Sequence, residues 1–420
     1  MGDIPRLQAQ RRALIVLVTA QILSGLGLAA GVTVGALLAQ DVFGSTGLAG
    51  LPSAVGTAGA ALAAVAIGRL SQARGRRSGL AAGDLAGAAG SAGVIAGAVV
   101  GSAFLLLIAL FVYGAGTAAN LLARYAGVDL AAPAHRARAV SIVLVATTLG
   151  GVAGPNLAAP FGDVAAALGV PELAGPFLLS GAAYAVAAAV LAVWLRPDPL
   201  LLARALDAEH GAADSGDRPG DAADPARPAT VRRRPGVPVG ALVMVLTQLI
   251  MVAIMTMTPV HMRDHGHGTA AAGLVIALHI GAMYLASPLT GWLVDRYGRL
   301  TIAVASGPVL LIAGIVAATA PAGSVAAFSV ALALLGLGWN FGLVAGTAIV
   351  ADAVPPDGRA RTQGMVDTDI SVAGAAGGML SGVVVAVAGY PLLAIGGGVL
   401  AAAVLAAVVM AAGVSAARSR

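Results

Sequence analysis

The sequence contains no cysteine and no lysine, and glutamate occurs only as Glu172 and Glu209. Without cysteine the chain can form neither disulfides nor thiolate metal sites. Charged residues make up 10% of the 420 residues, whereas soluble domains carry about 25%. The chain therefore has too few charges to cover a water-facing surface. All 24 basic residues are arginines, and no basic patch is interleaved with aromatic residues, so the positive net charge does not indicate nucleic-acid binding.

Long apolar runs take the place of charge. Hydrophobic residues make up 59% of the chain, and the mean hydropathy is +0.92. A membrane-spanning helix needs about 20 apolar residues, and runs near that length cover residues 13–39, 47–68, 79–100, 102–127, 139–161, 175–195, 237–262, 270–292, 300–319, 323–350, 363–387 and 390–415. We therefore predict an all-α integral membrane protein with twelve transmembrane helices. The first run is too long for a signal-peptide core, so we expect it to be the first of these helices.

Arginines are concentrated in alternate loops between the runs. These loops contain Arg69, Arg74, Arg76, Arg77, Arg136, Arg138, Arg296, Arg299, Arg359 and Arg361. The opposite loops contain only Arg263. Because cytoplasmic loops carry an excess of basic residues, we predict a multi-pass protein of the cell membrane with both termini in the cytoplasm.

The polar middle of the chain, residues 196–236, divides it into an N-terminal part, residues 1–195, and a C-terminal part, residues 237–420. Its composition is typical of a disordered cytoplasmic linker. The linker ends with Arg232–Arg234 before Pro235. This triplet either marks the start of the next helix or contacts anionic lipid headgroups.

One loop combines glycine and charge at regular positions: Gly291-Trp-Leu-Val-Asp295-Arg296-Tyr-Gly298-Arg299. It lies between two apolar runs, so we expect a tight turn between two membrane helices. Gly291 lets two helices approach closely, and Gly298 permits a positive φ. Asp295 can meet a helix N-terminus or an arginine.

The two parts of the chain repeat each other at an offset of 223 residues. Gly68, Gly75 and Arg76 align with Gly291, Gly298 and Arg299, and the segment Asp129 to Arg138 aligns with Asp352 to Arg361. The N-terminal copy has Gln72 and Ala73 where the C-terminal copy has an aspartate and an arginine. We therefore expect a fully charged latch of Asp295, Arg299 and Asp352 in the second half, with only Arg76 and Asp129 left to pair in the first.

The loop from Gly291 to Arg299 resembles motif A of the major facilitator superfamily of secondary transporters, Gly-x-Leu-x-Asp-Arg-x-Gly-Arg, at every defined position. With the repeat, the resemblance implies two six-helix bundles related by a pseudo-two-fold axis along the membrane normal. It also implies alternating access, in which a central cavity opens to one side of the membrane at a time.

A second motif, Gly150-Gly-Val-Ala-Gly154-Pro155, resembles the Gly-x-x-x-Gly-Pro motif of drug–proton antiporters. The antiporter pattern usually continues to a Gly-Gly pair, where this chain has Ala158 and Ala159. The arginine that many drug exporters carry before a Gly-x-Gly in the fourth helix is replaced here by Leu110. The alternative is a bend that lets the fifth helix pack against the eighth.

Ionisable residues within the runs are candidates for proton coupling because charge is costly in a bilayer. They are His279, Asp367, Asp369, Asp84 and Arg124. The two aspartates of the eleventh run are about 200° apart on a helix, so they do not face the same surface. Asp84 and Arg124 lie at a similar depth and could simply pair; alternatively, Arg124 exchanges Asp84 for Asp367 or Asp369 when the cytoplasmic side closes. His279 could be a hydrogen-bonded polar residue between the bundles.

In the superfamily that the chain resembles, helices 1, 4, 7 and 10 line the central cavity. On these runs the candidate contacts are Gln21, Asn120, Gln248, Met251, Met255, Trp339 and Asn340. Methionine adapts to varied apolar ligands, although packing between helices explains a methionine stripe equally well. Such walls suit a weakly charged, amphipathic organic molecule.

Histidines also gather at the outer end of the seventh run. His261, Asp264, His265 and His267 form a weak candidate metal site, and a solvated loop is the simpler interpretation. No cofactor is expected, and no nucleophile–base pair or phosphate-binding loop indicates an enzyme.

The sequence thus predicts a monomeric transporter whose partners are the lipid bilayer, a small-molecule substrate and protons. We expect proton-coupled export of a small amphipathic compound. The alternatives are a proton-driven importer of a metabolite and, from a different class, a membrane sensor that binds metal at its outer histidines.

Overall fold

The computed structural model describes the backbone of residues 3–43, 51–215 and 236–417. Side chains are described over residues 6–28, 54–209 and 236–402, apart from residues 152, 155, 156, 269 and 270. In these parts of the chain nearly every residue is helical, which confirms the predicted all-α class.

The first half contains six long helices: α1 (Asp3–Phe43), α2 (Leu51–Arg74), α3 (Arg76–Val100), α4 (Ala103–Ala126), α5 (Arg136–Ala167) and α6 (Gly175–Trp194). Two short 3-10 turns, η2 (Pro133–His135) and η3 (Glu172–Ala174), precede α5 and α6. Local chemistry explains the sharp connections. Gly75 turns the chain between α2 and α3 at φ 89°, and the Ser102 hydroxyl caps the start of α4 by accepting from the Leu105 N–H.

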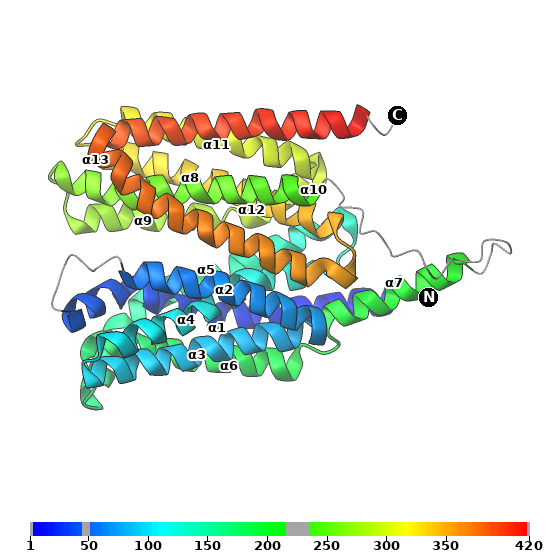
Figure 1. The fold of residues 1–420 in the computed structure, drawn as a ribbon, viewed down its shortest axis with the longest axis horizontal. Coiled ribbons are helices and arrows are strands. Elements are labelled where there is room, and N and C mark those ends of the chain that lie inside the picture. Colours follow the sequence, from blue (N-terminus) through cyan, green and yellow to red (C-terminus); the bar gives the residue numbers. More distant parts are fainter. Residues whose placement is uncertain (1–2, 44–50, 216–235, 418–420) are drawn as a thin grey trace.

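The second half contains α8 (Gly236–Asp264), α9 (Thr269–Tyr284), α10 (Ser287–Tyr297), α11 (Arg299–Thr319), α12 (Val325–Ala353) and α13 (Pro356–Ala417). Pro288 interrupts one crossing and separates α9 from α10, because proline has no N–H to donate to the preceding turn. Gly389, at φ 81°, folds α13 into two successive helices. Figure 1 shows the two halves as separate layers of nearly parallel helices.

Ten described helical segments are long and apolar enough to cross a bilayer. The 32-residue α5 is also long enough to cross, and the segment counted in α13 provides two crossings because it folds back at Gly389. This gives the predicted twelve. Exposed apolar side chains such as Phe104 and Val387, 75% and 83% exposed, cover the outside of the bundle. Such a surface fits lipid and not water.

The linker differs from the expectation of disorder over residues 196–236. Residues Pro199–Ser215 form α7, a helix whose Leu200 and Ala203 are buried against the bundle. The reason is local: good helix formers give α7 one apolar face, and Asp198 caps its start by accepting from the N–H groups of Leu200 and Leu201. Residues 216–235, including Arg232–Arg234 and Pro235, lie outside the described part of the chain.

Close helix packing in the first half depends on small residues. A Cβ on Gly150 of α5 would overlap the Ile22 carbonyl oxygen of α1 and lie 2.6 Å from the Leu26 nitrogen. Gly150 itself therefore serves the packing of α5 against α1, while α5 also contacts the predicted eighth helix, here α9 and α10, where Gly291 lies against Ala137. Gly154 is buried, and the side chain of Pro155 lies outside the described residues.

We predict that Gly150→Ala lowers the free energy of unfolding by about 1–3 kcal/mol, since the added methyl group overpacks the contact between α1 and α5. The neighbouring Gly151→Ala is the matched control, because a Cβ there meets nothing within 4 Å. An alanine in an unobstructed helix should be neutral or slightly stabilising. Thermal unfolding of the purified variants in detergent measures both effects, and equal unfolding temperatures would contradict the packing argument.

Candidate functional site: the contact between the two halves

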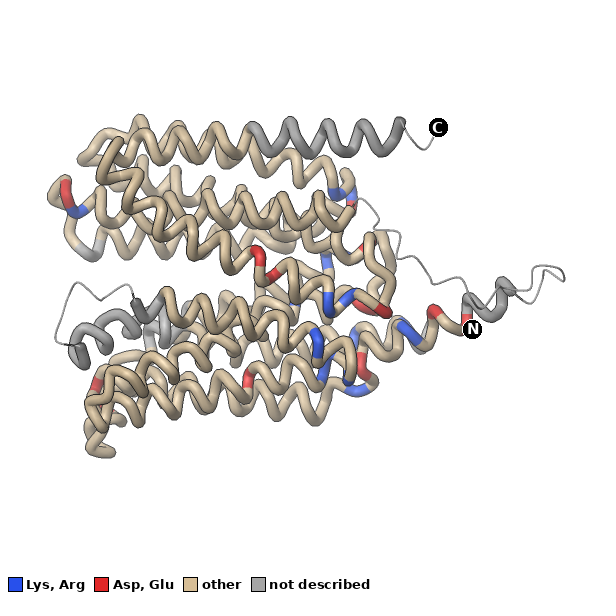
Figure 2. The backbone as a smooth tube through the Cα atoms, in the orientation of Figure 1, with Lys and Arg blue, Asp and Glu red and all other residues tan. Residues whose placement is uncertain are grey.

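Charge is concentrated at one end of the molecule. In Figure 2 most arginines and acidic residues lie at the end from which α7 projects, and few lie at the opposite end. We call the first the arginine-rich end. It contains the turns between α2 and α3, between α4 and α5, between α10 and α11, and between α12 and α13. These turns contain both copies of the motif around Gly68 and Gly291 and both copies of the segment that begins at Asp129 and Asp352.

In the second half, Asp295 at the end of α10 holds the start of α5. Its carboxylate accepts hydrogen bonds from the backbone N–H groups of Ala137 (3.2 Å) and Arg138 (3.0 Å). These N–H groups have no partner within their own helix, and the positive end of the helix dipole favours a carboxylate there. Gly291 permits the approach, because a Cβ on it would lie 2.8 Å from the Ala137 carbonyl oxygen.

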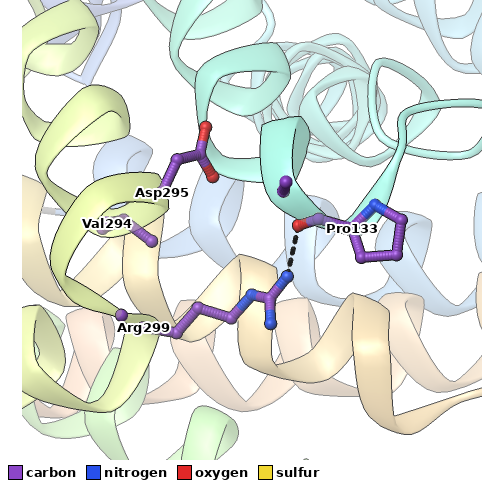
Figure 3. Close-up of a pocket in the computed structure, with 6 residues that line it drawn as sticks. Pro133, Val294, Asp295 and Arg299 are labelled. Atoms are coloured by element: carbon purple, nitrogen blue, oxygen red, sulfur yellow. Dashed lines mark hydrogen bonds between the residues drawn. The ribbon is translucent and has the colours of Figure 1, made fainter.

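Arg299 completes this latch across a small pocket. Its guanidinium donates to the Pro133 carbonyl oxygen at 2.5 Å and forms an ion pair with Asp352, which also pairs with Arg136. Figure 3 shows Arg299 reaching across to Pro133, with Asp295 on the same side of the pocket. The pocket has a volume of about 220 Å³ and is lined by Pro133, Ala134, Val294, Asp295, Gly298 and Arg299. Arg296 points to the exposed surface.

In the first half, Gln72 occupies the position that corresponds to Asp295. Its Oε1 accepts from the N–H groups of Ala360 (2.9 Å) and Arg361 (3.3 Å) at the start of α13. Its Nε2 donates to the carbonyl oxygens of Pro356 and Asp357 at 3.2 and 2.5 Å. Residues 360 and 361 are 137 and 138 displaced by 223, so the two latches are pseudo-symmetric. Sequence reasoning treated Gln72 only as a loss of charge, although the repeat itself indicated which helix start it would meet.

Beneath Gln72 lies a buried cluster of charges. Arg76 pairs with Asp129 at 2.7 Å and also donates to Gln363 across the two halves. Arg359 of the second half lies 3.5 Å from the same Asp129. Gly68 allows α2 to lie close against α13, because a Cβ added at this position would be only 2.8 Å from the Ala360 carbonyl oxygen.

A second ion pair joins the halves deeper in the bundle. Arg124 of α4 binds both carboxylate oxygens of Asp367 of α13, at 2.5 and 2.9 Å, and the two side chains are 0% and 2% exposed. Arg124 Nε also donates to the Thr347 hydroxyl of α12 at 3.1 Å. The Tyr125 hydroxyl donates to Asp367 at 3.3 Å, and its ring lies 4.3 Å below the guanidinium. Both carboxylate oxygens of Asp367 and all three guanidinium nitrogens of Arg124 therefore have hydrogen-bond partners, as their burial requires.

Asp84 does not pair with Arg124 in this structure. It is buried between α3 and α1, where the Ser24 hydroxyl donates to it at 3.2 Å. Asp369 is exposed on the outside of α13, while Asp367 points into the bundle. His279 lies buried within the second half and not between the bundles, and its Nδ1 bonds to the Leu332 carbonyl oxygen of α12 at 2.8 Å. The candidates for proton coupling thus lie in four different surroundings.

The candidate cavity residues form two groups inside the halves. Gln21 donates to the Asn120 carbonyl oxygen and the Thr147 hydroxyl, each at 3.0 Å. In the second half the Trp339 indole N–H donates to Gln248 Oε1 at 2.7 Å.

The Tyr284 ring stands edge-on to Trp339 at 5.7 Å. Met251 is buried in the core of the second half, and the half-buried Met255 packs against that core. A role of these residues in substrate binding stays a prediction.

Asn340 has a structural task at the break between α9 and α10. Its amide donates to the Met283 carbonyl oxygen and the Ser287 hydroxyl, each at 2.7 Å, and accepts from the Thr290 hydroxyl at 2.5 Å. The Met283 carbonyl lies next to the interruption caused by Pro288, so Asn340 supplies a donor where the helix is broken. All of its hydrogen-bonding groups point into the protein.

The histidines at the other end of the molecule each bond to or stack on another group of the protein, and the rings of His261 and His265 lie 4.3 Å apart. His261 stacks on Tyr390 at 4.4 Å, His265 Nδ1 bonds to the His261 carbonyl oxygen, and His267 Nε2 bonds to the Ala322 carbonyl oxygen. Asp264 is exposed. Within the described residues, no three His, Cys, Asp or Glu side chains are placed to hold one metal ion.

Three kinds of comparison with known proteins, by family model, by sequence and by structure, agree with one another. A family model described as Major Facilitator Superfamily matches residues 17–339 and 240–419. The chain is 55% identical over 390 residues to the uncharacterized MFS-type transporter YdeG of Bacillus subtilis (strain 168), covering 93% of this chain and 89% of YdeG. It is 32% identical to the riboflavin transporter RfnT of Brucella anthropi, covering 86% and 85%.

The chain belongs to the major facilitator superfamily. Its fold also matches the proton:xylose symporter XylE with a TM-score of 0.74 at 16% identity, covering 95% of this chain and 94% of XylE. The relatives and structural neighbours of this transporter are transporters, and none of them indicates a catalytic family. The predicted pair of six-helix bundles is confirmed.

We predict that Asp367→Leu lowers the stability of the transporter by about 3–5 kcal/mol, because it leaves Arg124 buried without its partner. The double variant Arg124→Met with Asp367→Leu should recover most of this loss, since no uncompensated charge remains. Asp369→Leu is the control, because Asp369 is exposed. Unfolding of the detergent-purified proteins measures the three values. A double variant no more stable than Asp367→Leu would show that the pair does not act through charge.

Proposed function

We propose that this major facilitator superfamily protein is a secondary active transporter that works by alternating access and exports a small amphipathic organic compound in exchange for protons. The observation that carries the proposal is the buried Arg124–Asp367 pair between the halves. A buried ion pair at a moving interface must be broken or exchanged in each cycle. A proton on the aspartate changes the free energy of that step.

The orientation follows from the arginines. Because basic residues are retained on the cytoplasmic side, the arginine-rich end of the protein faces the cytoplasm. Both termini and α7 are then on the cytoplasmic side of the cell membrane. The hydrogen bonds between the halves described above run from Gln72 and Asp295 at this end to Asp367. The described state is therefore closed towards the cytoplasm, and transport requires these contacts to separate.

Coupling to protons needs a titratable group whose charge changes the free-energy difference between the state closed to the cytoplasm and the state open to it. Protonation of Asp367 removes its negative charge and with it the attraction to Arg124. About 1.4 kcal/mol, one pKa unit, suffices to change a two-state ratio tenfold. Asp84, which has only a hydroxyl group as its described partner, is a second candidate, and His279 is a third.

The substrate is a weakly charged compound with an apolar part. The candidate contacts are amides, methionines and one tryptophan, and Arg124, one turn after Asn120 on α4, is paired with Asp367. A polyanion would find no free cation among these groups. The export direction rests on the likeness of Gly150, Gly154 and Pro155 to the antiporter motif.

A second candidate function is uptake of a metabolite, and the relationship to a riboflavin transporter favours a planar heteroaromatic substrate for it. The Trp339 and Tyr284 rings supply aromatic faces and edges, and Gln248 beside them supplies a hydrogen-bonding amide. Such a set suits stacking and edge recognition of a flat ring.

Reconstitution into proteoliposomes tests the function. Uptake and efflux are measured with an imposed pH gradient of either sign, with riboflavin and a panel of amphipathic cations and neutral compounds. The proposal expects accumulation on the acidic side of the membrane, driven by proton exchange. Accumulation on the alkaline side would favour the proton-driven importer, and movement of no compound would favour the sensor.

We predict that Asp367→Asn abolishes gradient-driven transport but retains exchange of labelled for unlabelled substrate, because asparagine keeps a hydrogen-bond acceptor for Arg124 and cannot titrate. Asp369→Asn, two residues further on α13 and exposed, should transport at the parent rate. If Asp367→Asn keeps gradient-driven transport at the parent rate, Asp367 is not the coupling residue.

A further inference from the structure

The linker helix α7 is fixed to the first half by one carboxylate. Asp198 accepts from the Arg77 N–H at the start of α3 (2.8 Å) and from the Leu200 and Leu201 N–H groups of α7 (3.0 and 3.2 Å). It therefore caps two helices at once. Gly75 leaves room for it, since a Cβ there would lie 2.5 Å from the Asp198 carboxyl carbon.

The same helix reaches the second half through Arg204. Its Nη2 donates to the Gln72 carbonyl oxygen in the last turn of α2 at 2.8 Å. Its Nε donates to the Pro356 carbonyl oxygen at the start of α13 at 3.4 Å, and Asp357 lies 3.5 Å away. One guanidinium thus binds both sides of the contact that the Gln72 side chain closes.

We propose that α7 is a clasp on the arginine-rich end, in which Asp198 anchors the helix to the first half and Arg204 holds the start of α13 against α2. The proposal rests on the alternating access proposed above. When α2 and α13 separate, Arg204 must release Pro356 and Asp357, because Asp198 keeps α7 with the first half. Arg204 is then a positioning residue, and the linker favours the closed state.

The carbonyl oxygens carry this contact more than the ion pair does. The Asp357 side chain is 90% exposed, and an exposed ion pair contributes little in water. Hydrogen bonds from a charged donor to backbone carbonyls are stronger. Replacing Asp357 should therefore matter much less than replacing Arg204, which gives the chain its own control.

The test measures the distance between the two halves at the arginine-rich end. Spin labels are attached through Ala192→Cys at the end of α6 and Leu300→Cys at the start of α11, two exposed positions in a chain without other cysteines. Double electron–electron resonance in nanodiscs, without substrate or gradient, gives the populations of short and long distances. Because no transport is required, the outcome is independent of substrate, direction and coupling ion.

We expect Arg204→Ala to raise the ratio of open to closed populations about fivefold, equivalent to about 1 kcal/mol. Arg204→Lys should restore part of the closed population. Asp357→Asn should resemble the parent, as should Arg196→Ala, an exposed arginine of the same linker without a described side-chain partner. An unchanged distribution in Arg204→Ala, or an equal shift in Arg196→Ala, overturns the proposal.

A second variant covers the case in which Arg204→Ala does not purify as a single species. Asp198→Asn keeps one acceptor oxygen and removes the other, so it loosens the anchor without touching Arg204. The clasp requires that this variant also shifts the populations towards the open state. If Asp198→Asn leaves them as in the parent, α7 is not held to the first half in the way described.

Discussion

The structure depends on the capture of a helix start in one half by a side chain of the other. Asp295 binds the N–H groups of the second and third residues of α5, and Gln72 binds the N–H groups of the fifth and sixth residues of α13 together with the carbonyl oxygens of its first two residues. A helix start presents N–H groups that its own backbone cannot satisfy. A side chain that satisfies them therefore adds to the ion pairs and hydrogen bonds that join the two bundles at this end.

Below these two captures the charges are arranged by depth. The partly exposed Asp352 and the buried Asp129 each hold an arginine from either half, and Arg124 with Asp367 forms the pair that lies deepest in the bundle. A buried pair contributes little net stability compared with apolar side chains. Its value lies in what separation costs, since neither charge can be left alone in a low-dielectric interior. The deep pair thus makes the closed and open states discrete.

The fold was predictable because twelve apolar runs, alternating arginines and the repeat all depend on spacing alone. The pairing of Arg76 with Asp129 also followed from the repeat. Two features did not, and a third was predicted only as one of two alternatives. The α7 helix was hidden in a segment of polar composition, and Asn340 serves a helix break instead of an open cavity. For Arg124 the sequence left Asp84 and the aspartates of the eleventh run open as partners, and the structure pairs it with Asp367. Each of these depends on which helix faces which, and a single sequence contains no record of that.

The two contacts differ in charge, because Asp295 is a carboxylate and Gln72 is a neutral amide. The linker helix α7 lies beside the Gln72 contact. Separation of α10 from α5 exposes the carboxylate of Asp295, whereas separation of α2 from α13 exposes only the amide of Gln72. An amide can accept from N–H groups and donate to carbonyl groups, but it adds no Coulomb attraction. Arg204 adds a charge at that position from outside the repeat. In the first half the charged group at this contact is therefore Arg204 of the linker, so in the clasp proposed above a movement of α7 changes the free energy of separating α2 from α13.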